Sequence, residues 1–250
     1  MNLVFPPLYA IIDAALLKTS ELSFTEMMAE SGVELLQYRN KRATSRQLFE
    51  VSQSISVKLS AAAPKGAGET HARSHAVSHS GEPQEKPRFI VNDRADIALL
   101  VNAGGVHVGQ EDLRVEEARG IVGPSRWVGV STHSLEQLDA ADKTSADYIA
   151  FGPIFPTRSK ENPDPVVGLD LLREARRHTR KPLVAIGGIT LERAAEVYRA
   201  GADSLAVMRE LIVCDDPASR VEQFLAEAER VRQEFGSART VGGARPEPGA

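Results

Sequence analysis

The sequence has a single cysteine, no excess of basic residues and no long apolar run. Cys214 has no second cysteine with which to form an internal disulfide, which fits a reducing compartment. Lys and Arg total 30 against 34 Asp and Glu, so the net charge of -4 gives no basic field for a nucleic-acid backbone. No apolar segment reaches the ~20 residues of a membrane span, and the first residues lack the features of a cleavable signal peptide. We therefore expect a cytoplasmic protein that binds neither nucleic acid nor membrane.

Eight short apolar runs alternate with helical segments along the 250 residues. Each run is apolar at nearly every position, as expected when both faces of a parallel strand are buried. Similar short sequences, such as Gly-Val and Ala-Asp, introduce the second, fourth, sixth and eighth runs, and a closed barrel allows such alternation. The expected strands are 8–13, 35–39, 89–93, 105–109, 127–132, 148–153, 182–189 and 204–208.

This pattern predicts an α/β protein with one (β/α)8 TIM-barrel domain over residues 1–235, because ~250 residues suffice for such a barrel. The last helix is expected at 217–235, and residues 236–250 are expected to form a disordered tail. An open, doubly wound sheet is the alternative, but no early Gly-x-Gly-x-x-Gly turn supports it.

Residues 61–87 interrupt the pattern between the second helix and the third strand. They are rich in Ala, Gly, Pro, Ser and His and have almost no large apolar residue, which predicts a flexible insertion. A helix would align His71, His75 and His79 as metal ligands, but the glycines and Pro83 disfavour a helix, so a solvated loop is preferred. Because the segment precedes a strand, we place it on the face opposite the carboxyl ends of the strands.

Two acidic residues follow neighbouring strands. Asp93 ends the third run, and Asp112 follows the fourth. If these strands are parallel neighbours, both carboxylates share one rim, where oxygen ligands hold Mg²⁺ and leave positions open for substrate phosphates. The alternative is a pair of solvated loop acids.

The same rim is expected to collect groups that bind phosphate. Three cations, Arg39, Lys41 and Lys160, lie beside the two acids and suit a diphosphate bridged by Mg²⁺. The Gly187-Gly188 turn and the loop after the eighth strand offer backbone N–H groups for a second, monoester phosphate. Each cation alone is more often a solvated loop charge, but together they predict a site for two phosphorylated small molecules.

Six motifs in this order resemble those of the thiamine phosphate synthase family. The resemblance runs over residues 8–212 and is interrupted only by the insertion. The motifs are Gln-Tyr-Arg-Asn-Lys at 37–41, Ile-Val-Asn-Asp-Arg at 90–94, Gly-Val-His-Val-Gly-Gln-Glu-Asp-Leu at 105–113, Ser-Thr-His-Ser at 131–134, Gly-Pro-Ile-Phe-Pro-Thr at 152–157 through Lys160, and Ala-Ile-Gly-Gly-Ile at 185–189.

The resemblance implies a TIM-barrel enzyme that joins hydroxymethylpyrimidine diphosphate to a thiazole phosphate with Mg²⁺ and releases diphosphate. It implies a dissociative mechanism that needs no protein general base, and His107 and His133 are expected to pack or hydrogen-bond beside the site. By position, the resemblance assigns Asp93 and Asp112 to the metal, Arg39, Lys41, Asn92 and Lys160 to the diphosphate, Gln37 and Ser131 to the pyrimidine, and Thr157, Gly188 and the backbone near Val207 and Met208 to the thiazole phosphate.

Two residues depart from the family pattern. Asn40 stands where Glu is common in the family, and Arg209 stands where a small Ser usually follows the eighth strand, beside the expected thiazole-phosphate site. Two other functions stay open: a thiazole tautomerase with His133 as its acid/base, and a catalytically silent binder of a thiamine precursor. Retention of Lys41, Asp112 and Lys160 favours the synthase. The sequence does not determine the oligomeric state, and a homo-oligomer is compatible with it.

Overall fold

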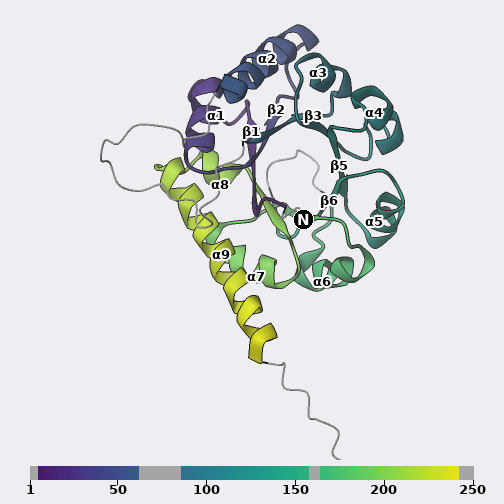
Figure 1. Cartoon of the computed structure of the whole chain (residues 1–250), viewed down its shortest axis with the longest axis vertical. Coiled ribbons are helices and arrows are strands. Elements are labelled where there is room, and N and C mark those ends of the chain that lie inside the picture. Colours follow the sequence, from purple (N-terminus) through teal and green to yellow (C-terminus); the bar gives the residue numbers. More distant parts are fainter. Residues whose placement is uncertain (1–4, 62–85, 158–163, 242–250) are drawn as a thin grey trace, which may run out of the picture.

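The computed structural model describes residues 5–61, 86–157 and 164–241, with side chains up to Phe235. Eight parallel strands pair in chain order, and β8 pairs with β1, so the sheet closes into a barrel (Figure 1). The predicted (β/α)8 TIM barrel is confirmed, and the open sheet is excluded. The strands are β1 (Leu8–Asp13), β2 (Leu35–Arg39), β3 (Arg88–Asn92), β4 (Gly105–Val108), β5 (Trp127–Thr132), β6 (Tyr148–Phe151), β7 (Leu183–Ile186) and β8 (Ser204–Val207).

Helices follow the strands and form the outer ring in Figure 1. No described helix has the combination of length and hydropathy that crossing a bilayer requires. The helices are α1 (Glu21–Glu30), α2 (Ser45–Ala61), α3 (Ala95–Leu100), α4 (Val115–Val122), α5 (Leu135–Asp142), α6 (Gly168–His178), α7 (Leu191–Arg199), α8 (Arg209–Ile212) and α9 (Pro217–Val241).

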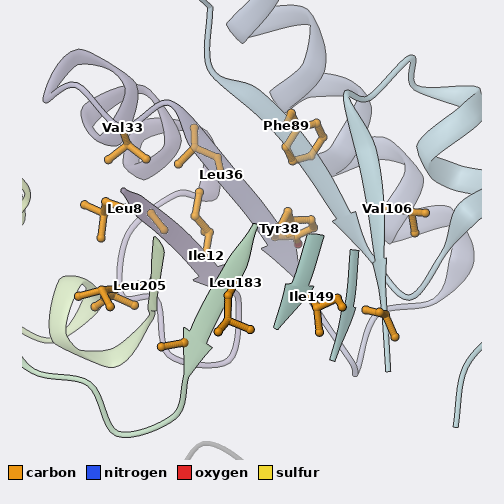
Figure 2. Packing of buried hydrophobic residues seen from close by; sticks show 14 of the residues in the cluster. Leu8, Ile12, Val33, Leu36, Tyr38, Phe89, Val106, Ile149, Leu183 and Leu205 are labelled. Carbon is orange, nitrogen blue, oxygen red and sulfur yellow. The ribbon is translucent and has the colours of Figure 1, made fainter. Parts of the chain in front are cut away.

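Strand side chains alternate between the helices and the barrel interior. Leu8, Leu36 and Val106 are among the buried residues that pack together in the main core (Figure 2). Their sequence neighbours Tyr9 and Leu35 belong to a second buried cluster inside the barrel. This alternation follows from the period of two in a β-strand.

The rings of Phe5, Trp127 and Tyr148 meet inside the barrel, where Gly129 leaves room for Tyr148. Phe5 stacks on Trp127 with ring centroids 5.2 Å apart, and the Arg88 guanidinium lies 4.0 Å from the centroid of the Trp127 ring. Tyr148 lies next to both rings, and a side chain at Gly129 would overlap it. Since Trp127 and Arg88 begin their strands, this aromatic cluster fills the amino-terminal end of the barrel.

The end of α9 differs from the prediction. The helix continues to Val241, so residues 236–241, assigned to a disordered tail, are helical. A single glycine, Gly236, costs only about 1 kcal/mol in a helix and does not end it. Residues 242–250 lie outside the described part of the chain.

Most of the insertion, including His71, His75 and His79, also lies outside the described residues. Its two ends are close together, since the Lys86 ammonium donates to the Ser60 carbonyl. These ends lie where α2 finishes and β3 begins, at the amino-terminal side of the barrel, where the sequence placed the insertion. Its flexibility stays a prediction.

Candidate active site

The residues expected to bind substrate and metal lie at or just after the carboxyl ends of the strands. In a parallel barrel all carboxyl ends share one rim, which is where TIM-barrel sites are built. The register pairs Asp13 with Arg39 and Asn92 with His107, so residues distant in sequence become neighbours there. Lys160 lies outside the described residues, and its role stays a prediction.

Asp93 turns back toward Asp112 through an unusual backbone conformation. Its φ of 62° is left-handed, a region that Asp tolerates better than most residues, and its N–H donates to the His107 carbonyl at 2.8 Å. Asp112 lies close enough to Asp93 for its negative charge to raise the Asp93 pKa. Such strained geometry concentrates at functional sites, where the surrounding structure holds it in place. The predicted proximity of these two acids is therefore confirmed.

The electrostatics of the acid pair favour an added positive charge. Burial, followed by the negative charge of Asp112, raises the pKa of Asp93, while Lys41 opposes this shift from 3.3 Å. The Asp112 carboxylate accepts a hydrogen bond from the Gly109 N–H at 2.8 Å. Among the described residues no cluster of three His, Cys, Asp or Glu forms a complete metal site. The pair therefore suits a hard cation that takes its other ligands from water and phosphate.

Arg39 has a partner that the sequence analysis missed. Its guanidinium donates to the Asp13 carboxylate, and the two side chains are 18% and 5% exposed. Asp13 also accepts from the Ala15 N–H at 2.9 Å. The sequence pattern that predicted Asp93 also applies to Asp13, because each is an acidic residue at the end of an apolar run. Asp13 holds Arg39 at the rim and leaves its other N–H groups to bind a ligand.

The two residues assigned to the pyrimidine, Gln37 and Ser131, are joined through the barrel interior. Gln37 Nε2 donates to Tyr9 Oη at 2.6 Å, and Tyr9 Oη lies 2.9 Å from Tyr148 Oη. The Tyr148 hydroxyl is 3.0 Å from His107 Nδ1, and His107 Nε2 is 2.8 Å from Ser131 Oγ. Tyr9 and Tyr148 were not singled out from the sequence. The only signal for them was a polar hydroxyl inside an apolar strand.

The Gly187-Gly188 turn is fixed against the loop after β6. Both glycines have positive φ, 90° and 65°, and a Cβ at Gly188 would lie 2.6 Å from the Pro156 carbonyl oxygen. The Phe155 N–H donates to the Gly187 carbonyl at 3.1 Å. Arg193 donates to the Gly188 carbonyl at 3.1 Å and lies 4.4 Å from the centroid of the Phe155 ring. Only glycine fits this turn. Thr157 follows Pro156, so the loop after β6 brings Thr157 near the turn in space.

At the carboxyl end of β8, main-chain groups rather than side chains are available to a ligand. Val207 is buried in the core, so only its main chain can face a ligand. Met208 precedes the single turn of α8, which the sequence did not predict, and Arg209 is exposed at its first position. Thr190 stands at the N-cap position of α7 but makes no side-chain cap bond.

Both histidines near the rim are held by hydrogen bonds, as predicted. His107 takes part in the interior chain described above. His133 Nδ1 lies 2.5 Å from the Gly152 carbonyl oxygen, so this nitrogen carries a proton and donates it. Its Nε2 lies 3.4 Å from the Asp164 carboxylate.

A separate hollow of about 820 Å³ lies between α9 and the amino-terminal ends of β7 and β8. Phe5, Tyr198 and Phe235 are among its lining residues, and none of the rim residues belongs to it. It is therefore distinct from the rim with the acid pair.

Fold and rim together define a class: a (β/α)8-barrel protein with paired acids, cations and a glycine turn for phosphorylated ligands at the carboxyl ends of its strands. The model of the thiamine monophosphate synthase family matches residues 75–211. The chain belongs to this family.

Individual relatives agree over nearly the whole chain. The thiamine-phosphate synthase of Koribacter versatilis is 45% identical over 229 residues, which cover 90% of this chain and 96% of the relative. That of Chloroflexus aurantiacus is 37% identical and covers 88% and 91%. The solved thiamine phosphate pyrophosphorylase of Pyrococcus furiosus superposes with a TM-score of 0.73 at 29% identity, over 90% of this chain and 96% of that one.

Proposed function

We propose that this protein is a thiamine phosphate synthase, a transferase that joins hydroxymethylpyrimidine diphosphate to hydroxyethylthiazole phosphate and releases diphosphate. The observation that carries the proposal is the facing pair of Asp93 and Asp112, with Lys41 3.3 Å from Asp93, in a chain of this family. A reaction that expels diphosphate needs positive charge where the leaving group gains negative charge.

The acid pair would hold Mg²⁺. When bound there, the metal supplies positive charge that stabilises the departing diphosphate. The same rim carries Lys41, Arg39 and Asn92. Together with Lys160, these residues would bind the diphosphate oxygens. Asp13 keeps the Arg39 guanidinium oriented for this contact.

The bond changes follow from the two substrates. The methylene C–O bond breaks and its electron pair leaves with diphosphate, while the aminopyrimidine stabilises the methylene cation. The thiazole nitrogen then forms the new C–N bond. Gln37 and Ser131 would orient the pyrimidine, and Thr157, Gly188 and the backbone of Val207 and Met208 would hold the thiazole phosphate. No proton leaves a reacting atom in these steps, so no protein base is required.

The paired acids also separate this proposal from its rivals. A thiazole tautomerase has no diphosphate to expel, so Asp93, Asp112 and Lys41 would have no role in it. His133 would be its acid/base, but both its ring nitrogens face protein oxygens. The cytoplasmic location and the lack of a nucleic-acid partner stay predictions from composition.

The test is incubation of the purified protein with both substrates and Mg²⁺, with diphosphate and thiamine phosphate measured as products. Both should appear in equal amounts. Isomerisation of a thiazole carboxylate without coupling would select the tautomerase. Binding of a precursor without any product at saturating substrate would select the silent binder.

A further inference from the structure

A chain of buried hydrogen bonds crosses the barrel between Gln37 and Ser131. Its inner members come from three strands: Tyr9 from β1, His107 from β4 and Tyr148 from β6. Tyr9, Gln37, Tyr148 and His107 are 1%, 2%, 0% and 7% exposed, so bulk water cannot replace a missing partner.

The donors and acceptors in this chain have a direction. Gln37 Nε2 can only donate, so Tyr9 Oη accepts from it. The Tyr9 proton then has the Tyr148 hydroxyl as its acceptor. If Tyr148 donated to Tyr9 instead, the Tyr9 proton would be buried without an acceptor, which costs about 1–3 kcal/mol.

The direction continues to the rim. With Tyr148 accepting from Tyr9, its own proton goes to His107 Nδ1, which leaves the His107 proton on Nε2. His107 Nε2 donates to Ser131 Oγ, so the Ser131 hydroxyl proton points away from the chain. Burial raises the pKa of Tyr9 and that of Tyr148, so both phenols keep the proton that they donate.

We propose that Tyr9, Tyr148 and His107 are positioning residues that fix Gln37 Oε1 as an acceptor and the Ser131 hydroxyl as a donor toward the substrate. This inference rests on the proposed function and deepens it. An aromatic ring with an exocyclic amino group and an unprotonated ring nitrogen satisfies both ends. In an oxo analogue a carbonyl oxygen replaces the amino group and faces Gln37 Oε1, so two acceptors oppose each other. The hydrogen-bond chain therefore selects the aminopyrimidine over its oxo analogue.

The direction can be measured in the free protein without catalysis. ¹⁵N spectroscopy of histidine-labelled protein distinguishes a protonated from an unprotonated ring nitrogen, and the His107→Gln variant assigns the His107 signals. We expect a proton on Nε2 and none on Nδ1 at neutral pH. A proton on Nδ1 would overturn the proposal, whether or not the protein is a synthase.

The consequence for the substrate is tested with Tyr148→Phe, which keeps the ring and removes the hydroxyl link. We expect the KM for the pyrimidine diphosphate to rise about tenfold, as for one lost hydrogen bond. The KM for the thiazole phosphate should not change. The preference for the amino substrate over its oxo analogue should fall about tenfold as well.

Tyr198→Phe is the matched control. Tyr198 is also a buried tyrosine, and its hydroxyl donates to the Pro7 carbonyl at 2.9 Å, at the amino-terminal end of the barrel. This variant should lower Tm without changing either KM. If Tyr148→Phe also changed only Tm, its role would be structural and the positioning role would be refuted. If the unmodified protein formed no product, the proposed function would be refuted. The ¹⁵N measurement would still test the donor–acceptor direction of the hydrogen bonds between Gln37 and Ser131.

Discussion

Two aspartates at strand ends occupy opposite electrostatic situations. Asp13 is buried against the Arg39 guanidinium, which neutralises it. Asp93 faces another carboxylate, and burial and Asp112 together raise its pKa. An acid with a raised pKa, such as Asp93, destabilises the folded state when it ionises, whereas loss of the Asp13 carboxylate would leave a largely buried guanidinium without its anion. The two positions should therefore respond differently to the same substitution.

The first prediction is that Asp93→Asn abolishes most turnover without loss of stability. Replacing a carboxylate with an amide removes the repulsion from Asp112, so Tm without Mg²⁺ should stay equal or rise. Asp112→Asn should likewise reduce turnover strongly. The measurements are product formation at ordinary Mg²⁺ and thermal unfolding without Mg²⁺. Full activity in either variant would show that the metal-ligand assignment is wrong.

Asp13→Asn is the companion variant for stability. It leaves the largely buried Arg39 without its anion, so it should lower the free energy of unfolding by about 1–3 kcal/mol. This is less than the ~3–5 kcal/mol of a fully buried pair, because Arg39 keeps some contact with solvent. Chemical denaturation measures the difference. A variant as stable as the unmodified protein would contradict the pairing.

Single residues show what the sequence could and could not predict about the site. Asp93 and Asp112 were predicted because each follows an apolar run, and the ends of parallel neighbours always meet. The links from Tyr9 through Tyr148 to His107 join strands that are not neighbours. They depend on how far the strands are staggered around the barrel, which no local pattern encodes.

Among the elements, β5 and β6 depend on each other through one small residue. Gly129 lies on β5 opposite the Tyr148 ring, and a side chain there would overlap that ring. The second prediction is that Gly129→Ala displaces Tyr148, lowers Tm by several degrees and raises the KM for the pyrimidine substrate. Overpacking in a filled core costs about 1–3 kcal/mol.

Gly120→Ala is the matched control for that change. Gly120 lies within α4, and a Cβ there meets nothing within 4 Å. Since alanine favours a helix over glycine by about 0.5–1 kcal/mol, this variant should be more stable and equally active. Equal effects of the two substitutions would show that the Gly129 position is not tightly packed.

A third prediction concerns α5 and α6, which share an exposed ion pair. His178 donates a hydrogen bond to the Asp139 carboxylate, and this bond, with a smaller contribution from Glu174, raises the pKa of His178. A raised histidine pKa stabilises the fold below the unfolded value of about 6.5, and this contribution is lost as pH rises through the folded value. His178→Gln should therefore lower Tm at pH 5.5 and have no effect at pH 9. A constant difference across this range would contradict the pair.

Three of the strands, β1, β2 and β5, have the predicted limits, whereas the other five differ from the predicted limits by one or more residues. The short α8 was missed because four residues carry no periodicity. The end of α9 was predicted at residue 235, but the helix continues to Val241.

At the scale of the whole molecule, the insertion is attached on the side of the barrel away from the acid pair. The fourth prediction is that a variant lacking residues 62–85 folds and keeps nearly full turnover. Ser60 and Lys86 already touch, so a short turn can join α2 to β3. Steady-state kinetics and thermal unfolding measure the outcome. A folded variant with little activity would contradict the placement of this segment.

The whole fold was the most predictable level. Eight apolar runs separated by helical segments are compatible with few arrangements, and a closed parallel barrel buries all of them. The repeat on alternate strands favoured closure before any pairing was known. Interior side chains were less predictable, because alternation gives the inward residues but not which of them meet across the barrel.

The aromatic cluster of Phe5, Trp127 and Tyr148 blocks passage along the barrel axis from the amino-terminal end. Substrates and products would then enter and leave only through the opening at the carboxyl ends of the strands, which imposes an order on binding and release. A pyrimidine held at the depth of Gln37 would have to arrive before the thiazole and could not depart until the way above it had cleared.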